Sequence, residues 1–351
     1  MKRHTIDIEN LTFDENIVDV RSPSEYAQDH IPGALNLPVL NDEERNIVGW
    51  TYKNKSPFEA KRMGAAIVAK NIAIHIDGPL KNKSKNWAPI IYCWRGGQRS
   101  GSMGTIFRQI GWPARQLKGG YKSFRRMVVR DLESLSMSLN YTVICGLTGT
   151  GKTELLQKLN DLGGQTLDLE SVASHRGSLL GEDPKNVQPS QKQFETQIWS
   201  RLRQLDYTQT VFVESESKKI GDVRLPKALM DRIRSSECIY ISGKQEVRIE
   251  RILRDYEHLL GKPESVRKAL SKLRERHGNS VIDKWFDLIQ SKNWSTLVSQ
   301  LLELHYDPSY KKSLMTNFSK IKKSKVFDFH SNSKKSLNDL AKTILTEYTQ
   351  P

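Results

Sequence analysis

A cysteine followed directly by glycines and arginines is the stretch of this chain best equipped for covalent chemistry. Cys93 follows the apolar run Ile90–Tyr92, and the next six residues are Trp94, Arg95, Gly96, Gly97, Gln98 and Arg99. Apolar residues at helical spacing come next and predict a helix whose N-terminus faces the sulfur. Loop N–H groups, the helix dipole and the arginines would favour a thiolate with an anion beside it. The pattern predicts a nucleophilic sulfur at an anion site; a buried structural cysteine is the alternative.

A second motif predicts a phosphate site. The segment Gly146–Thr153 reads G-x-x-x-x-G-K-[ST] and follows a strand expected over Tyr141–Cys145. A helix with a leucine stripe is expected after it, which is the context of a Walker A phosphate loop. Its phosphate-binding residues would be Gly146, Thr148, Gly149, Thr150, Gly151, Lys152 and Thr153. Backbone N–H groups would surround phosphate oxygens, the lysine would add a charge, and the threonine hydroxyl could reach Mg²⁺.

Polar residues farther along the chain could complete the phosphate site. The strand expected over Thr210–Glu214 suits the Walker B position, and Asp168 and Glu170 end another expected strand. The candidates for binding a metal, acting as a base or lining the site are Asp168, Glu170, His175, Arg176, Glu214 and Glu216. Helix capping is the alternative for some of these carboxylates.

Three arginines follow at helical spacing and are similar to the lid arginines of small P-loop kinases. They are Arg248, Arg251 and Arg254. The alternative is that they form the solvated face of an amphipathic helix.

The elements that must position these residues alternate between strands and helices. A strand is expected over Ile17–Val20, a short helix from Tyr26 after a capping sequence at Ser22, and another strand from Leu35. This alternation predicts an α/β fold with a parallel sheet covered on both faces. The Cys93 loop would then lie at the carboxyl end of a strand, where open α/β sheets bind ligands.

Two domains are expected, and the charge of the chain suggests a polyanionic partner. A helix expected over Ser123–Leu139 closes the first domain, so we expect domains at residues 1–138 and 139–351. The net charge is +15, and basic residues crowd residues 267–276 and 311–325 of a helical C-terminal region. Such runs suit the phosphate backbone of a nucleic acid; solvated helix faces are the alternative.

Aromatic residues near these charges are candidates for stacking on bases. Tyr306, Tyr310 and Phe318 accompany the last basic run. Trp50 and Tyr52 lie in an insertion between Leu40 and Trp87, where they could stack on a base, hold an apolar substrate group or belong to the core.

The composition argues against several classes of protein. The three cysteines, Cys93, Cys145 and Cys238, include no close pair, so neither a disulfide framework nor a cysteine-based zinc site is expected, and no metal site is assigned. No signal peptide and no apolar run of membrane-spanning length is evident. We therefore expect a soluble, cytoplasmic protein without a membrane partner.

The first domain resembles the rhodanese family over roughly residues 5–135. The resemblance is carried by Asp19-Val20-Arg21, Glu25-Tyr26, His30-Ile31-Pro32-Gly33-Ala34 and the Cys93 loop. It implies an N-terminal rhodanese-like parallel-sheet domain, followed by a P-loop NTPase-like α/β domain, and a cysteine that carries transferable sulfur. Asp19, Arg21 and His30 are expected to be structural. Cys93 and Arg99 also fit the C-x5-R pattern of cysteine-dependent phosphatases, some of which share this fold.

The pairing of the two domains resembles the tRNA 2-selenouridine synthase family along essentially the whole chain. Besides the Cys93 loop and the Walker A motif, the matching segments are Phe58–Gly64, Ala173–Ser178, Phe194-Glu195 with Ile198-Trp199, and Val213–Ser217. The resemblance implies a transferase that alkylates wobble 2-thiouridine with geranyl diphosphate and then replaces the sulfur with selenium from selenophosphate. tRNA, at its anticodon region, would be the partner.

The resemblance also sets expectations for the two sites. Cys93 would take up selenium as a perselenide or assist at C2 of the base. The phosphate loop would bind the prenyl diphosphate or a tRNA phosphate rather than ATP. No tightly bound cofactor is expected, although Mg²⁺ could take part. The alternatives are a cysteine phosphatase or sulfurtransferase with a nucleotide-binding regulatory domain, and an RNA-binding protein without enzyme activity.

Overall fold

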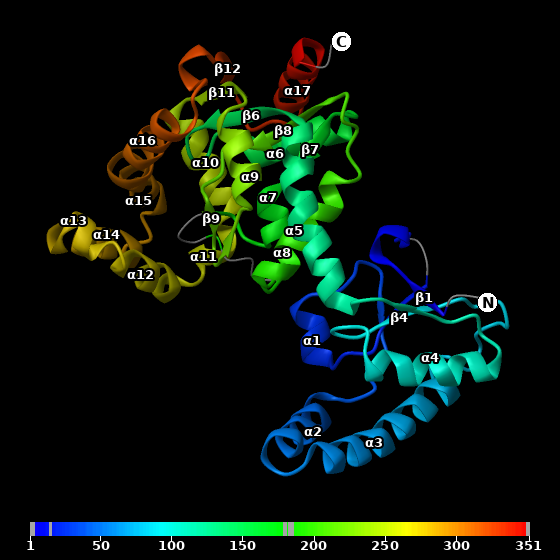
Figure 1. Cartoon of the computed structure of the whole chain (residues 1–351). Coiled ribbons are helices and arrows are strands. Elements are labelled where there is room, and N and C mark those ends of the chain that lie inside the picture. The colour runs from blue at the N-terminus through cyan, green and yellow to red at the C-terminus, as the bar shows by residue number, and fades with distance from the viewer. Residues whose placement is uncertain (1–3, 14–15, 178–180, 182–185, 349–351) are drawn as a thin grey trace. The chain divides into compact units, whose positions relative to one another are not determined.

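The chain forms two compact units (Figure 1). The computed structural model describes residues 4–13, 16–177, 181 and 186–348. The first unit comprises Met1–Asp131 and Pro189–Ser200, and the second comprises Leu132–Gln188 and Arg201–Pro351. Ser178, at the end of one segment that carries the family resemblance, lies outside the described residues.

The first unit contains a five-stranded sheet in which every neighbouring pair is parallel. Its strands, in spatial order, are β1 (Thr5–Ile6), β5 (Arg115–Leu117), β4 (Ile90–Tyr92), β2 (Ile17–Asp19) and β3 (Leu35–Asn36). The central strand β4 is fully buried, as its apolar sequence requires. The expected parallel sheet is confirmed, and Cys93 stands at the carboxyl end of its middle strand.

Helices surround this sheet. They are α1 (Pro23–Gln28), α2 (Asp42–Asn54), α3 (Pro57–Asp77), α4 (Gln98–Ile110) and α5 (Gly120–Ser138), which continues into the second unit. Ser22 and Glu25 form a capping box at α1, and Ser56 caps α3 ahead of a proline. The sequence predicted α4 and α5. It did not predict α2, which packs against α3 as a helical hairpin inserted between β3 and β4 (Figure 1).

A segment from the second half of the chain packs with the first unit. Its helix, α8, runs from Gln191 to Leu202. The Trp199 ring lies 5.5 Å from the Phe124 ring in an edge-to-face arrangement. The Thr196 hydroxyl donates a hydrogen bond of 3.0 Å to the buried carboxylate of Asp29. Two of the residues that carry the family resemblance, Ile198 and Trp199, are therefore core residues of this packing.

The second unit contains another parallel five-stranded sheet. Its strands, in spatial order, are β12 (Lys325–Phe329), β11 (Glu237–Gly243), β6 (Asn140–Gly146), β8 (Thr210–Glu214) and β7 (Gln165–Leu167). A two-stranded antiparallel ribbon lies apart from it, formed by β9 (Lys219–Ile220) and β10 (Val223–Arg224). The central strand β6 leads into the phosphate loop, and its register pairs Ile144 with Glu214. The expected P-loop architecture is confirmed.

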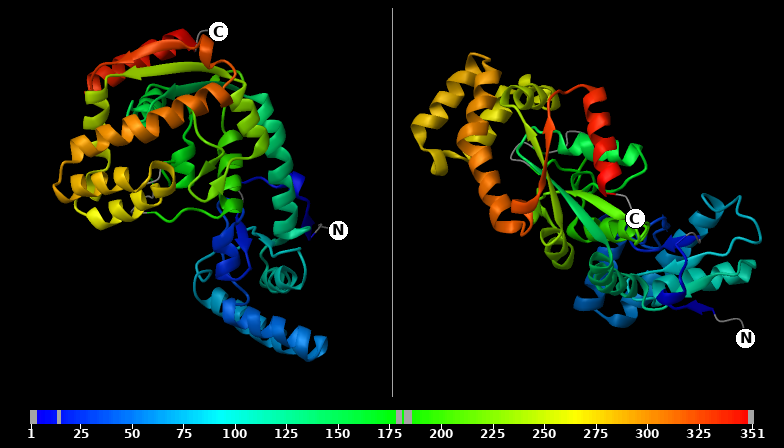
Figure 2. Two further views of the ribbon diagram at one scale, coloured as in Figure 1. Left: turned by 90° about the vertical axis from the view of Figure 1, so that its left-hand side faces the viewer. Right: turned by 90° about the horizontal axis from the view of Figure 1, so that it is seen from above.

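Helices cover both faces of this sheet. They are α6 (Lys152–Asp161), α7 (Leu169–Ala173), α9 (Lys227–Arg234), α10 (Gln245–Asp255), α11 (Glu257–Leu260), α12 (Pro263–Ser271), α13 (Arg274–His277), α14 (Asn279–Gln290), α15 (Trp294–Leu301), α16 (Asp307–Asn317) and α17 (Lys334–Tyr348). Figure 2 shows α17 in red on the opposite side of the sheet from the yellow-to-orange helices. The unit has two separate apolar clusters among its described residues. In one, α6 and α17 pack on the strands of the sheet; the other is enclosed by α12, α14 and α15.

Candidate functional site

The Cys93 thiol lies at the N-terminus of α4. Its Sγ accepts hydrogen bonds from the N–H of Gly97 and the hydroxyl of Ser100, each 3.2 Å long. Gly97 is the residue before the first turn of α4, so the helix dipole also points at the sulfur. Both donors and the helix dipole would stabilise negative charge that develops on the sulfur.

Gln116, from the neighbouring strand β5, orients the Ser100 hydroxyl. Its side-chain nitrogen lies 2.8 Å from Gly96 O, 3.0 Å from Gly97 O and 2.8 Å from Ser100 Oγ. Carbonyl oxygens can only accept, so this atom must be the amide NH₂ group and must donate to Ser100 Oγ. The hydroxyl proton is then left to point at Cys93 Sγ or at Gly97 O, which is 3.3 Å away.

Replacing Ser100 with Ala is expected to slow alkylation of Cys93 by iodoacetamide at neutral pH by about tenfold. A hydrogen bond to a charged group contributes about 1.5–3 kcal/mol, and this variant removes one from the thiolate. All three cysteines are buried, so alkylation of Cys93 is followed by mass spectrometry of the peptide that contains it. Ser102→Ala, an exposed position on the same helix, is the control. Equal rates for both variants and the wild type would contradict this role for Ser100.

Two glycines allow the loop to lie against the start of α5. A Cβ atom on Gly96, whose φ is +65°, would stand 2.5 Å from Leu117 O. A Cβ atom on Gly120, at φ +55°, would stand 2.2 Å from Cys93 O. The N–H of Tyr121 donates to Cys93 O at 2.8 Å, which fixes the loop from behind. Any side chain at either glycine would therefore displace the sulfur.

The other loop residues have distinct environments. Trp94 packs on Tyr121 with ring centroids 5.2 Å apart, and Lys192 Nζ lies 5.7 Å from its ring. Arg95 and Gln98 are exposed beside the sulfur. Arg99 Nη1 instead forms a 2.6 Å ion pair with Glu25. A C-x5-R phosphatase needs that guanidinium on its phosphate, so the ion pair disfavours the phosphatase alternative.

The rhodanese-like residues outside the loop are structural. Arg21 and Asp19 form a buried 2.6 Å ion pair, and Arg21 Nη2 also donates to Asp29 O at 2.6 Å. The His30 ring stacks on Tyr26 at 3.8 Å. These residues brace the sheet edge beneath the loop, as the sequence predicted.

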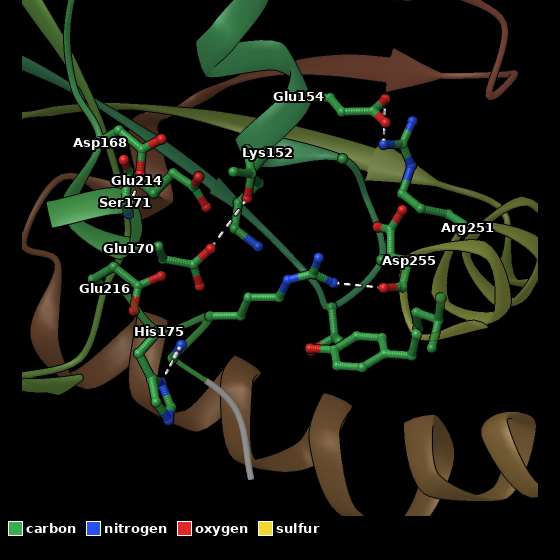
Figure 3. Close-up of a pocket in the computed structure, with 18 of the residues that line it drawn as sticks. Lys152, Glu154, Asp168, Glu170, Ser171, His175, Glu214, Glu216, Arg251 and Asp255 are labelled. Carbon is green, nitrogen blue, oxygen red and sulfur yellow. Dashed lines mark hydrogen bonds and ion pairs between the residues drawn. The ribbon is translucent and has the colours of Figure 1, made fainter. Parts of the chain in front are cut away.

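The phosphate loop opens into a cavity of about 730 Å³ within the second unit (Figure 3). The cavity is lined by Thr148, Gly149, Gly151, Lys152 and Thr153 from the loop and by the predicted Asp168, Glu170, His175, Arg176, Glu214 and Glu216. Gly146 and Thr150 lie beneath the loop and shape it: Thr150 Oγ1 donates to Leu147 O at 2.8 Å. The structure thus brings the predicted polar residues of this unit together.

Cations on one side of the cavity suit an anion. The Lys152 side chain is nearly buried; its Nζ lies 3.1 Å from Gly146 O and 5.2 Å from the Tyr310 ring. Arg251 packs over Gly151, so closely that a Cβ there would stand 2.7 Å from the guanidinium carbon. Arg251 is buried and forms an ion pair of 2.7 Å with Glu154, yet its Nη2 has no hydrogen-bond partner among the described residues. A phosphate oxygen would satisfy that donor.

Carboxylates form the opposite wall (Figure 3). Burial, together with the charges of Glu214 and Glu216, raises the pKa of Glu170 to about 9. Burial raises the pKa of Glu214 to about 8 and that of Glu216 in the same direction, against the opposing effect of Lys152. Glu170 lies in the first turn of α7 rather than at a strand end, because Asp168 caps this helix and β7 ends at Leu167. Burial likewise raises the pKa of Asp168.

These shifts predict a loss of stability with rising pH. Glu170 stays protonated in the folded chain while its unfolded counterpart ionises near pH 4.5, so folding becomes less favourable from there up to about pH 9. Between pH 6 and pH 8 this one group costs about 2–3 kcal/mol at ~1.4 kcal/mol per proton and pH unit. The free energy of unfolding of Glu170→Gln, measured in urea without divalent cations, should therefore fall less between pH 6 and pH 8 than that of the wild type. Glu303→Gln, at an exposed position, is the control; parallel curves for wild type and Glu170→Gln would contradict the prediction.

The remaining predicted residues have structural partners. His175 Nδ1 accepts a 3.0 Å hydrogen bond from Gly177 N, and Arg176 Nη1 donates to Asp255 O at 2.6 Å. Arg248 is buried. Its Nε donates a hydrogen bond to Thr148 O, and its Nη1 and Nη2 form a bidentate ion pair with Asp307.

The three arginines of α10 therefore do not share a solvated face. Arg248 and Arg251 are buried against the phosphate loop, while Arg254 is half exposed and pairs with Glu154.

The aromatic residues divide between core, cavity and surface. Phe318 is buried in the core, whereas Tyr306 and Tyr310 line the phosphate cavity. Trp50 and Tyr52 are 56% and 54% exposed, so they are surface residues rather than core.

The sequence did not predict several contacts of the Cys93 loop and of the phosphate cavity. Gln116 carries no motif, and neither the Glu25–Arg99 ion pair nor the position of Tyr310 in the phosphate cavity has a local signal, because the partners are distant in the chain. Among the residues that the structure describes, no group of three or more His, Cys, Asp or Glu side chains is arranged to hold a metal ion. Within the same residues, no helix is long and apolar enough to cross a membrane.

Comparisons with known proteins agree with both halves of this description. The family described as "tRNA 2-selenouridine synthase AAA domain" matches residues 139–343, and the "Rhodanese-like domain" matches residues 6–127. A tRNA 2-selenouridine synthase of Nitrosomonas europaea is 31% identical across 93% of this chain and 89% of its own length. One from Alcanivorax borkumensis is 35% identical across 73% of this chain and 70% of its own.

A solved structure matches part of the chain. It is the N-terminal domain of a putative ATP/GTP binding protein from Clostridium difficile 630, with 36% identity and a TM-score of 0.32. The match covers 35% of this chain and 98% of that domain.

Proposed function

The chain belongs to the tRNA 2-selenouridine synthase family, whose members modify tRNA, and we propose that it converts wobble 2-thiouridine to 2-selenouridine in two steps. The observation that supports the proposal is that one chain combines a cysteine whose sulfur accepts two hydrogen bonds with a separate phosphate-loop cavity. The Cys93 loop offers a nucleophile at a helix N-terminus, and the phosphate cavity offers N–H groups and cations, with no cysteine among its described lining residues. A two-step reaction with two anionic co-substrates uses both.

The first step is alkylation at the phosphate cavity. The diphosphate of geranyl diphosphate binds the N–H groups of the Gly146–Thr153 loop, Lys152 and the unpaired Nη2 of Arg251. The sulfur of 2-thiouridine attacks C1 of the geranyl group, the C1–O bond breaks, and diphosphate leaves with the electron pair. The N3 proton of the base passes to the departing diphosphate or to water. The cations stabilise charge that grows on the leaving diphosphate, which is where they lower the barrier.

Mg²⁺ fits the donors around this leaving group. Hard oxygen donors are what Mg²⁺ prefers, and the cavity offers the Thr153 hydroxyl and the carboxylates of Glu170 and Glu214. Burial raises the pKa of both carboxyls, so each would lose its proton on holding the ion. A bound Mg²⁺ would neutralise part of the diphosphate charge.

The second step replaces sulfur with selenium at Cys93. Selenophosphate already contains selenium at the selenide level, so forming a perselenide from it would require an oxidant. A route without oxidant has Cys93 attack C2, which expels the geranyl thiolate and forms a C2–S bond to the protein. The selenium of selenophosphate then attacks C2, Cys93 leaves as thiolate, and water cleaves the Se–P bond to release phosphate. Gly97 N–H and Ser100 stabilise the thiolate in both halves.

The outer end of the α2–α3 hairpin is the surface that best suits the anticodon loop. Residues 45–70 contain six lysines and arginines and a single acidic residue. Trp50, Tyr52 and Phe58 are exposed there, Phe58 to 72%. Aromatic rings among positive charges stack on unpaired bases and neutralise phosphates.

Replacing Trp50 with Ala should weaken tRNA binding about tenfold at fixed salt, because one stacked base contributes about 1–3 kcal/mol. Fluorescence anisotropy with a labelled anticodon stem-loop measures the change. Ile74→Ala removes an equally exposed apolar side chain from the far end of the hairpin and should have no effect. Equal losses in both variants would contradict a stacking role for Trp50.

Measurements of ATP turnover test whether the phosphate loop binds geranyl diphosphate rather than ATP. Binding of geranyl diphosphate predicts that ATP turnover stays at background with and without tRNA. It also predicts that inorganic diphosphate competes with geranyl diphosphate. Rapid, tRNA-stimulated ATP hydrolysis would contradict this assignment and favour a nucleotide-driven step.

A further inference from the structure

A second, apolar cavity adjoins the phosphate cavity. It has a volume of about 80 Å³ and lies in the second unit between α10, α11 and α15, which Figure 1 labels. Its walls include Leu253, Leu260, Trp294 and Val298, all only partly buried although apolar. At ~15 Å³ per water molecule it would hold about five waters, yet almost nothing in it could bind them. We call this cavity the apolar slot.

The apolar slot and the phosphate cavity share residues. Thr148, Ile252, Tyr256 and Tyr306 line both. Ile252 reaches the phosphate loop itself, since a Cβ on Gly149 would stand 2.9 Å from its Cδ1. A ligand whose anionic head lies on the loop could therefore extend its other end into the slot.

The chemistry of the slot excludes a nucleoside and suits a hydrocarbon. A purine or ribose carries several donors and acceptors, and burying them unpaired costs several kcal/mol in total. A hydrocarbon chain has none, and its burial against leucine, valine and tryptophan is favourable. An anionic site joined to an apolar slot matches a molecule with a diphosphate head and an isoprenoid tail.

We propose that the apolar slot binds the isoprenoid chain of the alkyl donor and limits its length. The proposal rests on the proposed function, because it supplies the tail site for the diphosphate bound at the phosphate loop. Tyr256 and Tyr306 stand at the junction, where the reacting carbon would lie between head and tail. Val298 and Trp294, from α15, form the wall that sets how much chain fits.

The test changes the size of the slot and measures donor preference. Val298→Trp should reduce kcat/KM for geranyl diphosphate at least tenfold while that for dimethylallyl diphosphate changes little, because the shorter chain needs less room. Trp294→Ala should raise the use of farnesyl diphosphate relative to geranyl diphosphate. Leu304→Trp, at an exposed position outside the slot, is the control and should leave both ratios unchanged. Alkylated nucleosides are quantified by mass spectrometry.

Binding of inorganic diphosphate separates the possible failures. The affinity for inorganic diphosphate should be equal in the wild type and the variants, since the phosphate loop is unaltered. If the wild type alkylates tRNA with none of the three donors, the proposed function fails. If the wild type alkylates but neither variant shifts its donor ratio, the slot proposal is overturned. Should Val298→Trp lose diphosphate binding through misfolding, the farnesyl-to-geranyl ratio of Trp294→Ala decides the matter alone.

Discussion

Replacing Cys93 with Ala will abolish selenium incorporation and leave alkylation by geranyl diphosphate intact. The thiolate attacks C2 in the proposed second step, and removal of a covalent nucleophile costs far more than ~10²-fold in rate. No cysteine is among the described residues that line the phosphate cavity, so the proposed first step does not use the thiol. The expected product is tRNA that accumulates S-geranyl-2-thiouridine, measured by mass spectrometry of its nucleosides.

Cys238→Ala is the matched control for this experiment. Cys238 is a buried cysteine of β11 in the other unit, and its replacement should leave both steps unchanged. Full selenium incorporation by the Cys93→Ala variant would remove the covalent role from Cys93. Loss of alkylation in that variant would instead mean that the two sites are not chemically separate.

Replacing Lys152 with Ala will impair alkylation and leave the selenium step intact. Lys152 is the buried cation of the phosphate loop, and its loss removes charge stabilisation from the leaving diphosphate. Alkylation should fall by ~10² or more, and 2-selenouridine should no longer form from 2-thiouridine. A tRNA supplied already S-geranylated should still be converted, because the Cys93 loop is unaltered.

Lys158→Ala is the control for Lys152. It lies on the same helix, α6, but pairs with Asp161 at the surface. Alkylation and selenium incorporation should both persist in the Lys158→Ala variant. If Lys152→Ala alkylates normally, the phosphate cavity is not the alkylation site. If it also fails on geranylated tRNA, the loop serves both steps.

Local sequence predicted the elements whose signals are local. The Walker A loop, the strand Thr210–Glu214 and the apolar strand before Cys93 are all present, because a strand, a glycine loop and an amphipathic helix are each encoded over a few adjacent residues. Glu170 was placed at a strand end but begins a helix, since an aspartate that caps a helix also resembles the tip of a strand.

Features that depend on distant residues were not predictable. Gln116 orients Ser100 from another strand, and Glu25 occupies Arg99 from α1, 74 residues earlier in the chain. The apolar slot is lined by side chains from α10, α11, α12 and α15, and no local pattern shows that these side chains meet. The return of α8 to the first unit has no signature in composition, because a core helix has the same pattern in either unit.

Mass spectrometry of tRNA nucleosides tests the two-step account most directly. The wild-type chain is incubated with 2-thiouridine-containing tRNA and geranyl diphosphate, and selenophosphate is added in a second stage. S-geranyl-2-thiouridine should appear in the first stage and be replaced by 2-selenouridine in the second, while selenophosphate alone should give no product. Unchanged nucleosides in both stages, or 2-selenouridine formed without geranyl diphosphate, would contradict the account.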